Sequence, residues 1–298
     1  MRLRNSLTAI AFFAIMMGAI GASAAVSAST PLGHGSHDCV RSVPNGSTVD
    51  PYSGKVELAN GTVVKASSIP CMSGTKASTT GNEAYGYLTV SSSFYYTNFQ
   101  DSWTVPNSPT NGAFSVGMAD IFWDGLQNSN GIEQPILIYG CIEWNIFNQC
   151  VEGSNTAWYI YDYSDVGGSV YISSAIAVSP GDSIYLGEIQ RDPSLTFCSG
   201  NGPGYSVDVE DITIGKAVDM AVCDNNQYTD AIAGSFEVHS ISGCNQLPNS
   251  SSDAFSSISF TTSPSGASPS YGTGYYNFCS VGASWNSGDT TLTLSWTP

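Results

Sequence analysis

The sequence predicts an all-β protein in which many antiparallel strands close one core, as a sandwich or a barrel. From about residue 81 onward, runs rich in Val, Ile, Thr and Tyr alternate with turns rich in Gly, Pro, Asn and Ser. No amphipathic helical stretch of useful length follows the first 24 residues. The chain also holds 8 cysteines, an even number that suits a disulfide-bonded domain.

The predicted strands follow one another at short intervals and alternate in side-chain type with period two. A turn over Ser179–Asp182 separates two of them, and roughly 215 residues of such strands can close one sizeable core. The predicted strands are Tyr85–Val90, Gly168–Val178, Asp182–Ile189, Tyr205–Ile214, Ser235–Ile241, Ser256–Thr262 and Thr290–Trp296.

The first 24 residues have the order of features that is typical of a secretory signal peptide. Arg2 and Arg4 precede an apolar run over Leu7–Ile20, and Ala22-Ser23-Ala24 then offers a cleavage site. A membrane anchor is the alternative, but the run is short and rich in small residues. We therefore expect export, and a secreted, extracellular chain with no membrane partner after signal removal.

Cysteine pairing cannot be derived from the sequence order alone. If neighbours in sequence pair, the disulfides are Cys39–Cys71, Cys141–Cys150, Cys198–Cys223 and Cys244–Cys279. The chain has only 3 His and no C-x-x-C pair, so neither a metal site nor a cofactor is expected.

Charge divides the chain into two parts. From residue 81 onward there are 21 Asp and Glu but two basic residues, Arg191 and Lys216, which disfavours nucleic acid as a partner. The repulsion between the negative charges weakens as the carboxylates protonate, so the acidic composition suits a protein that works at acidic pH. A secreted protein that needs net charge only for solubility would explain the acidic composition equally well. The second part, residues 25–80, carries four basic and three acidic residues and few aromatic residues. It is predicted to be a cleavable pro-segment or a flexible extension that docks on the acidic domain, residues 81–298.

Several catalytic chemistries are disfavoured by the residues present. His239 is the single histidine of residues 81–298, and no G-x-S-x-G motif accompanies it. No Asp-Thr-Gly or Asp-Ser-Gly triplet occurs, no Gly-rich phosphate loop follows a strand, and the cysteines are expected to be paired. Carboxylates and carboxamides remain as catalytic groups.

One series of short motifs is more specific in its order than any of its members is alone. It consists of Phe122–Gln127 (FWDGLQ), Ile132–Leu137 (IEQPIL), Ala157–Tyr159 (AWY), Val178–Asp182 (VSPGD) and Phe236–Val238 (FEV). Over roughly residues 85–265 this order resembles the eqolisin-type glutamic peptidases.

The resemblance implies an antiparallel double-sheet β-sandwich of the concanavalin-like jelly-roll type, with curved sheets. It implies a monomeric, acid-acting endopeptidase, made as a zymogen, that cleaves polypeptides without a metal. Gln134 and Glu237 match the catalytic dyad of the family. Trp123 matches the tryptophan of the substrate cleft, Trp158 matches that of the A-W-Y segment, and Gln127 stands where the family often has Asp. In such a dyad Glu acts as general base on a water molecule, and the Gln carboxamide donates to the developing oxyanion.

The register of the motifs leaves alternatives open. A second alignment of Ile136–Gly140 puts Ile138, not Gln134, at the Gln position, and a slip on the later strand puts Ser235 at the Glu position. If Ile138 occupies the dyad position, a non-catalytic sandwich that binds glycans or the cell surface becomes the better interpretation, because Trp and Tyr also suit sugar binding. A structural envelope component, which would self-associate and lack a cleft, is the third hypothesis.

Overall fold

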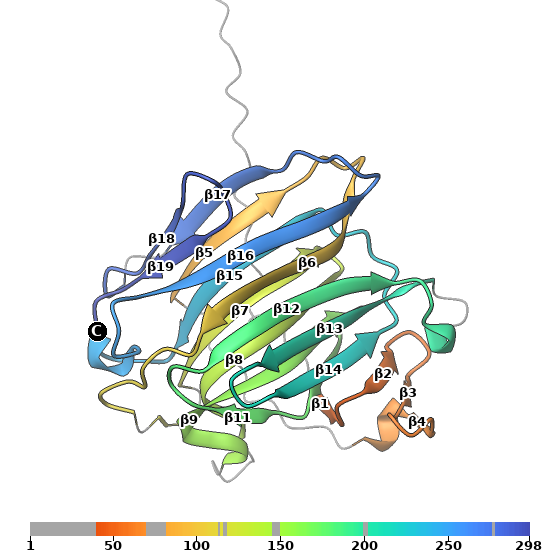
Figure 1. The fold of residues 1–298 in the computed structure, drawn as a ribbon. Helices are drawn as coiled ribbons and strands as arrows, with labels where there is room; N and C mark the ends of the chain where they lie inside the picture. The colour runs from red at the N-terminus through yellow and green to blue at the C-terminus, as the bar shows by residue number, and fades with distance from the viewer. Residues whose placement is uncertain are drawn as a thin grey trace, which may run out of the picture.

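The computed structural model describes residues 40–69, 82–112, 114–115, 118–144, 150–198, 202–275 and 278–298. These residues form two stacked β-sheets (Figure 1), so the predicted disulfide-bonded β-sandwich is confirmed. The helices among them are single 3₁₀ turns, η1 (Ala66–Ser68), η2 (Thr196–Cys198) and η3 (Cys244–Gln246). In the part of the chain that is described, no helix is long and apolar enough to cross a membrane. The predicted signal peptide lies outside these residues.

The first sheet, here called sheet A, carries the motifs of the sequence series. Its strands in spatial order are β1 (Val40–Val43), β10 (Ser169–Ser173), β9 (Cys150–Val166), β8 (Gly131–Trp144), β7 (Ala119–Asn128), β15 (Asp230–His239), β5 (Asn82–Thr89) and β17 (Ser270–Tyr275), and β11 (Ile176–Val178) also pairs with β9. Every pair is antiparallel except β1 with β10.

The second sheet, sheet B, covers one face of sheet A. Its strands in order are β18 (Gly282–Trp285), β19 (Leu292–Ser295), β16 (Ser252–Ser263), β6 (Tyr95–Thr104), β12 (Ser183–Asp192), β13 (Gly204–Asp211), β14 (Lys216–Val222), β2 (Ser47–Asp50), β3 (Lys55–Glu57) and β4 (Val63–Lys65). Only β14 with β2 is parallel. Each predicted strand lies in one of the two sheets, and Gly168–Val178 divides into β10 and β11.

The main core lies between the two sheets and is rich in aromatic side chains. Phe122 of β7 stacks on Phe236 of β15, with ring centroids 4.4 Å apart. Sheet B contributes Trp103 and Phe255, whose rings lie 5.2 Å apart. Because side chains alternate along a strand, the residues between these core positions point to the other face of each sheet.

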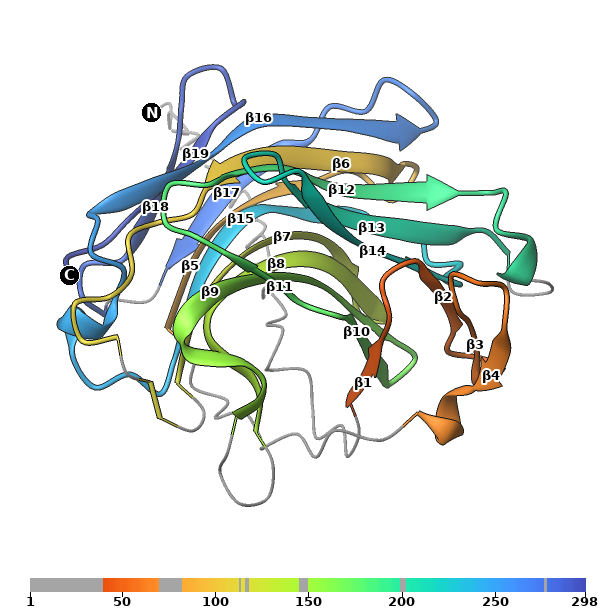
Figure 2. The same ribbon diagram turned by 60° about the horizontal axis from the view of Figure 1, so that its bottom comes forward.

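Sheet A also has an apolar layer on the face turned away from sheet B. The sheet curves so that this face is concave (Figure 2). The layer includes Ile121, Trp123, Ile136, Ile138 and Ile232, all buried. The Phe122–Gln127 and Ile132–Leu137 motifs are therefore buried on both faces of the sheet.

Five carboxyl groups are buried on the side of the strands that faces the inter-sheet core. They are Asp101, Asp120, Asp124, Glu133 and Asp162. Burial raises the pKa of each of them well above its ordinary range. Asp124 of β7 lies against Gly187 of β12, where an added β-carbon would stand 2.6 Å from Asp124 Oδ1. The interior is therefore built for neutral, protonated carboxyl groups.

Residues 40–69 are part of both sheets. β1 extends sheet A, and β2 to β4 extend sheet B. Val43, Val49 and Val56 are buried in a core of their own with Tyr171 and Met220. The compositional boundary near residue 80 is thus not a boundary of the fold, and removal of residues 25–80 stays a prediction.

Three of the four predicted disulfides are confirmed. Cys141 pairs with Cys150, Cys198 with Cys223, and Cys244 with Cys279. The fourth, Cys39–Cys71, lies outside the described residues.

Candidate active site on the concave face of sheet A

Three polar side chains of β15 point to the concave face. Ser235, Glu237 and His239 alternate with Phe236 and Val238, which belong to the core between the sheets. All three are buried; Ser235 and Glu237 have no exposed area at all. Buried polar groups need partners, and the partners come from the neighbouring strand and from within β15.

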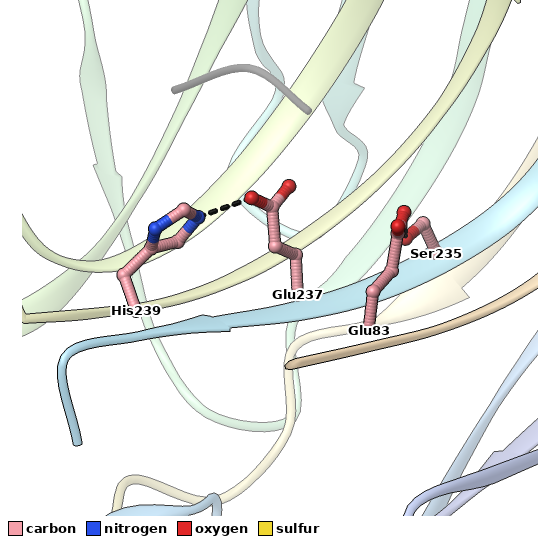
Figure 3. Close-up of polar contacts among 4 residues, drawn as sticks. All are labelled: Glu83, Ser235, Glu237 and His239. Atoms are coloured by element: carbon pink, nitrogen blue, oxygen red, sulfur yellow. Dashed lines mark hydrogen bonds and ion pairs between the residues drawn. The ribbon is translucent and has the colours of Figure 1, made fainter. Parts of the chain in front are cut away.

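Glu83 of β5 lies directly opposite Glu237 in the strand pair. Ser235 donates a hydrogen bond from Oγ to Glu83 Oε1 at 2.7 Å, and His239 Nε2 contacts Glu237 Oε1. Figure 3 shows the two carboxyl groups pointing to the same side, each with its own partner. We call Glu83, Ser235, Glu237 and His239 the carboxyl cluster.

Electrostatics distinguish the two carboxyl groups. The pKa of Glu83 is raised to about 8, mainly by burial and then by the neighbouring Glu237, while the hydrogen bond from Ser235 lowers it. Like charges this close disfavour double ionisation. At acidic and neutral pH, Glu83 is therefore a neutral acid.

Trp123 lies beside the carboxyl cluster on β7. It is directly opposite Ser235, and the next concave-facing residue of β7, Ile121, is opposite Glu237. The Cζ3 edge of its indole ring lies 3.3 Å from where a β-carbon on Gly125 would stand. The indole Nε1 lies on the opposite side of the ring system from Cζ3. Among the described residues this buried N–H has no hydrogen-bond partner.

Gln134 shares the concave face but lies in a different row of residues. It is level with Gly125 of β7, whose added β-carbon would meet Gln134 Cγ at 3.1 Å, and it pairs with Tyr163 of β9. It is fully buried, and neither its oxygen nor its nitrogen has a hydrogen-bond partner within the described part of the chain.

The register separates Gln134 from Glu237. Glu237 pairs with Ile121, and Ile121 pairs with Ile138, so Ile138 is the β8 residue level with Glu237. Gln134 is four residues along and two strands across, which places the two Cα atoms roughly 16 Å apart on a regular sheet. A direct contact or a single bridging water, a heavy-atom separation of about 3–6 Å, does not fit that spacing.

The other two residues of the predicted site lie apart from the carboxyl cluster. Trp158 is buried between the sheets against Phe122 and Tyr139, on the opposite face of sheet A from Trp123. The physical reason is strand parity: Tyr159, the neighbour of Trp158, takes the concave side. Gln127 lies at the far end of β7, where it pairs with Ile132 and Asp230.

Little in the sequence indicated that two members of the carboxyl cluster, Glu83 and Ser235, belong to the site. Glu83 precedes the predicted strand at Tyr85, and only alternation with Tyr85 and Tyr87 could have placed it on the same face. Ser235 entered only as a register alternative to Glu237.

Comparison with known proteins gives distant structural matches. No protein-family model and no curated relative matches the chain. A crystal structure of scytalido-glutamic peptidase with a transition state analog inhibitor is similar over 72% of this chain and 98% of its own, at 17% identity and a TM-score of 0.46. SCP-B, a member of the eqolisin family of peptidases in complex with the tripeptide Ala-Ile-His, is similar over the same shares, at 16% identity and a TM-score of 0.43. Similarity at this level assigns neither residues nor activity.

The arrangement suits proton-transfer chemistry. Oε1 of Glu237 is held by His239, and its Oε2 has no hydrogen-bond partner among the described residues. Glu83, 4% exposed, offers a proton on the neighbouring strand. No group of three or more His, Cys, Asp or Glu in the described ranges could hold a metal ion.

Proposed function

We propose that this protein is an exported, acid-acting peptidase in which Glu237 is the general base. The observation that carries the proposal is a fully buried carboxylate with one oxygen held by His239, on a concave, aromatic face of the sheet. The free Oε2 would accept a proton from the water that attacks a peptide carbonyl. The motif order around Trp123 and Glu237 supports a polypeptide substrate.

Gln134 has a different role in this proposal from that of a direct dyad partner. Its amide is buried and its donor and acceptor are unpaired within the described residues. A carboxamide in that position could bind the backbone of an extended peptide four to five residues from the scissile bond, since an extended chain spans about 3.4 Å per residue and the separation is about 16 Å. We propose Gln134 and Trp123 as substrate-binding residues on the same face.

Access to the site requires a change in the chain as it stands. Trp123, Gln134 and Glu237 are completely buried, and Val40 of β1 packs against the apolar layer of the concave face. A precursor whose N-terminal segment is cut or displaced at acidic pH would open this face. This supports a zymogen, with residues 25–80 as the segment that is processed.

The test is cleavage of acid-denatured casein at about pH 4, near the reference pKa of Glu, by the chain purified after acid incubation. Glu237→Gln keeps the shape of the side chain but cannot accept a proton, so cleavage should fall by a factor on the order of 10² or more. Glu210→Gln, on the sheet B strand β13, is the matched control and should cleave as the unmodified protein does. Full activity of Glu237→Gln would refute the proposal.

A glycan-binding function is the second candidate, and one observation favours it. The β8 residue level with Glu237 is Ile138, which has no polar group, while Tyr159, Tyr161 and Tyr163 line the same face from β9. Such a protein would be retarded in native gels that contain polysaccharide and would show no proteolysis. Retardation that survives Glu237→Gln, together with intact casein, would favour this candidate.

A further inference from the structure

We infer that Glu83 is a second catalytic residue, a carboxylic acid that gives its proton to the carbonyl oxygen of the substrate while Glu237 takes a proton from water. The inference rests on the proposed function and deepens it. It replaces the carboxamide of a Gln–Glu dyad with a second carboxyl group, supplied by β5 and not by β8.

The first support is the geometry of the strand pair. Glu83 and Glu237 are directly opposite each other on β5 and β15, so their β-carbons are about 5 Å apart. Both side chains point to the concave face (Figure 3). Their carboxyl groups can therefore reach a single substrate carbonyl and a single water.

The second support is that each carboxyl group is anchored from its outer side. Ser235 donates to Glu83 Oε1, and His239 contacts Glu237 Oε1. Anchoring leaves the remaining oxygen of Glu237, which has no hydrogen-bond partner in the described part of the chain, available for the reaction. Fixed side chains of this kind are what a catalytic pair requires.

The third support is independent of the carboxyl groups. Trp123 is completely buried, its indole N–H is unpaired among the described residues, and it lies directly opposite Ser235 of the carboxyl cluster. A buried N–H without a partner is rare and calls for a ligand or a water. An acceptor bound at the carboxyl cluster, such as a carbonyl oxygen, could supply this partner, because Ser235 bonds Glu83 and pairs with Trp123.

The surroundings of Glu83 keep it protonated. On β15 it faces Glu237, with Ser235 and His239 on either side, and β7 presents Ile121 and Trp123 behind them. On its other flank β17 pairs Tyr275 with Ala84. Burial and the charge of Glu237 raise the pKa of Glu83 to about 8. Glu83 is thus the member of the pair that enters the reaction as the acid.

The reaction balances with these two groups. The water oxygen bonds to the carbonyl carbon, one water proton passes to Glu237, and the carbonyl oxygen takes the proton of Glu83, which gives a neutral tetrahedral diol. Glu237 then protonates the amide nitrogen as the C–N bond breaks, and a diol hydroxyl returns its proton to Glu83. One water is consumed, and each carboxyl group ends as it began.

Ile138 explains why a second carboxyl group would be needed. It occupies the β8 position level with Glu237 and has no polar atom to donate to an oxyanion. Glu83 is level with Glu237 from the opposite flank of β15.

The experiment compares Glu83→Gln, Glu83→Asp and the control Glu210→Gln in steady-state cleavage of a quenched peptide at about pH 4, near the carboxyl reference pKa. Glu83→Gln should lower kcat by a factor on the order of 10²–10⁴ with KM changed less than about threefold, because proton donation is lost and binding is kept. Glu83→Asp retains an acid and should be at least about tenfold faster than Glu83→Gln, which a merely structural role would not predict. Circular dichroism confirms that each variant is folded.

The outcomes separate the two proposals. If Glu237→Gln is inactive but Glu83→Gln keeps most of its kcat, the role of Glu83 is refuted and the peptidase function stands. If Glu83→Asp is no faster than Glu83→Gln, Glu83 acts in folding and not as an acid, and the inference is again overturned. If the unmodified chain cleaves nothing, both proposals fall.

Discussion

The buried carboxyl group of Glu83 should make the folded state less stable as the pH rises. Its pKa is about 8 in the folded protein, against 4.5 for an ordinary Glu. Between these two values the unfolded chain releases a proton that the folded chain retains, so the free energy of unfolding falls with pH. Glu83→Gln removes this dependence, because glutamine cannot ionise and is not repelled by Glu237.

The size of the effect follows from the difference between the two pKa values of Glu83. Each pH unit above the ordinary pKa costs about 1.4 kcal/mol until the folded-state pKa is reached. The contribution is fully present below about pH 4.5 and is mostly lost by pH 7, which amounts to about 3 kcal/mol. In a domain of this size 1 kcal/mol corresponds to roughly 2–4 °C in Tm.

The assay is urea unfolding at pH 4 and at pH 7 with the disulfides intact. The difference in free energy of unfolding between Glu83→Gln and the unmodified protein should shift by about 3 kcal/mol in favour of the variant from pH 4 to pH 7. Glu210→Gln should shift by less than about 0.5 kcal/mol, as surface changes do. If Glu83→Gln follows the unmodified protein within about 1 kcal/mol at both pH values, the group is not held as a buried acid and the reasoning is refuted.

Three further outcomes are expected. Asp124→Asn should raise the urea midpoint at pH 7 and leave it unchanged at pH 3, because burial raises the pKa of Asp124 and its neutral form is the stable one; equal effects at both pH values would contradict this. Gln134→Ala should raise KM by a factor on the order of 10 with kcat changed less than about threefold, because it loses a bond to the substrate backbone and none to the reacting atoms; a drop in kcat alone would place it in the chemistry. The precursor held at about pH 4 should be cut near residue 80, and residues 40–69 should separate from the main domain in gel filtration, because Val40 of β1 covers the concave face in the uncut chain; a full-length chain that is fully active would show that no processing is needed.

The strands and the local disulfides could be predicted from the sequence because both depend on residues that are close together in the chain. Alternation along Ser235–Ile241 and the spacing from Cys141 to Cys150 needed no long-range information. β1 to β4 were not predicted, because they have only three or four residues each, and β1 and β2 pair with distant strands.

The site depends on register, which only long-range pairing fixes. A bulge next to Gly234, whose φ of 151° suits glycine, shifts β15 against both of its neighbours. That shift sets Glu237 level with Glu83 and Ile138, whereas local motifs matched Gln134 equally well. The position of Trp158 could not be predicted for the same reason, since a shift of one residue along the strand decides whether its side chain faces the core between the sheets or the concave side.

The most direct test of a catalytic carboxyl pair is a double-mutant cycle on kcat at about pH 4, close to the carboxyl reference pKa. Glu83→Gln and Glu237→Gln should each lower kcat by a factor on the order of 10²–10⁴, and the double variant should be no more than about threefold slower than the slower single variant, because groups that act as a unit lose their function together. If the kcat losses of the two single variants multiply in the double variant, or if Glu83→Gln has the kcat of the unmodified protein, the two residues do not act as a catalytic pair.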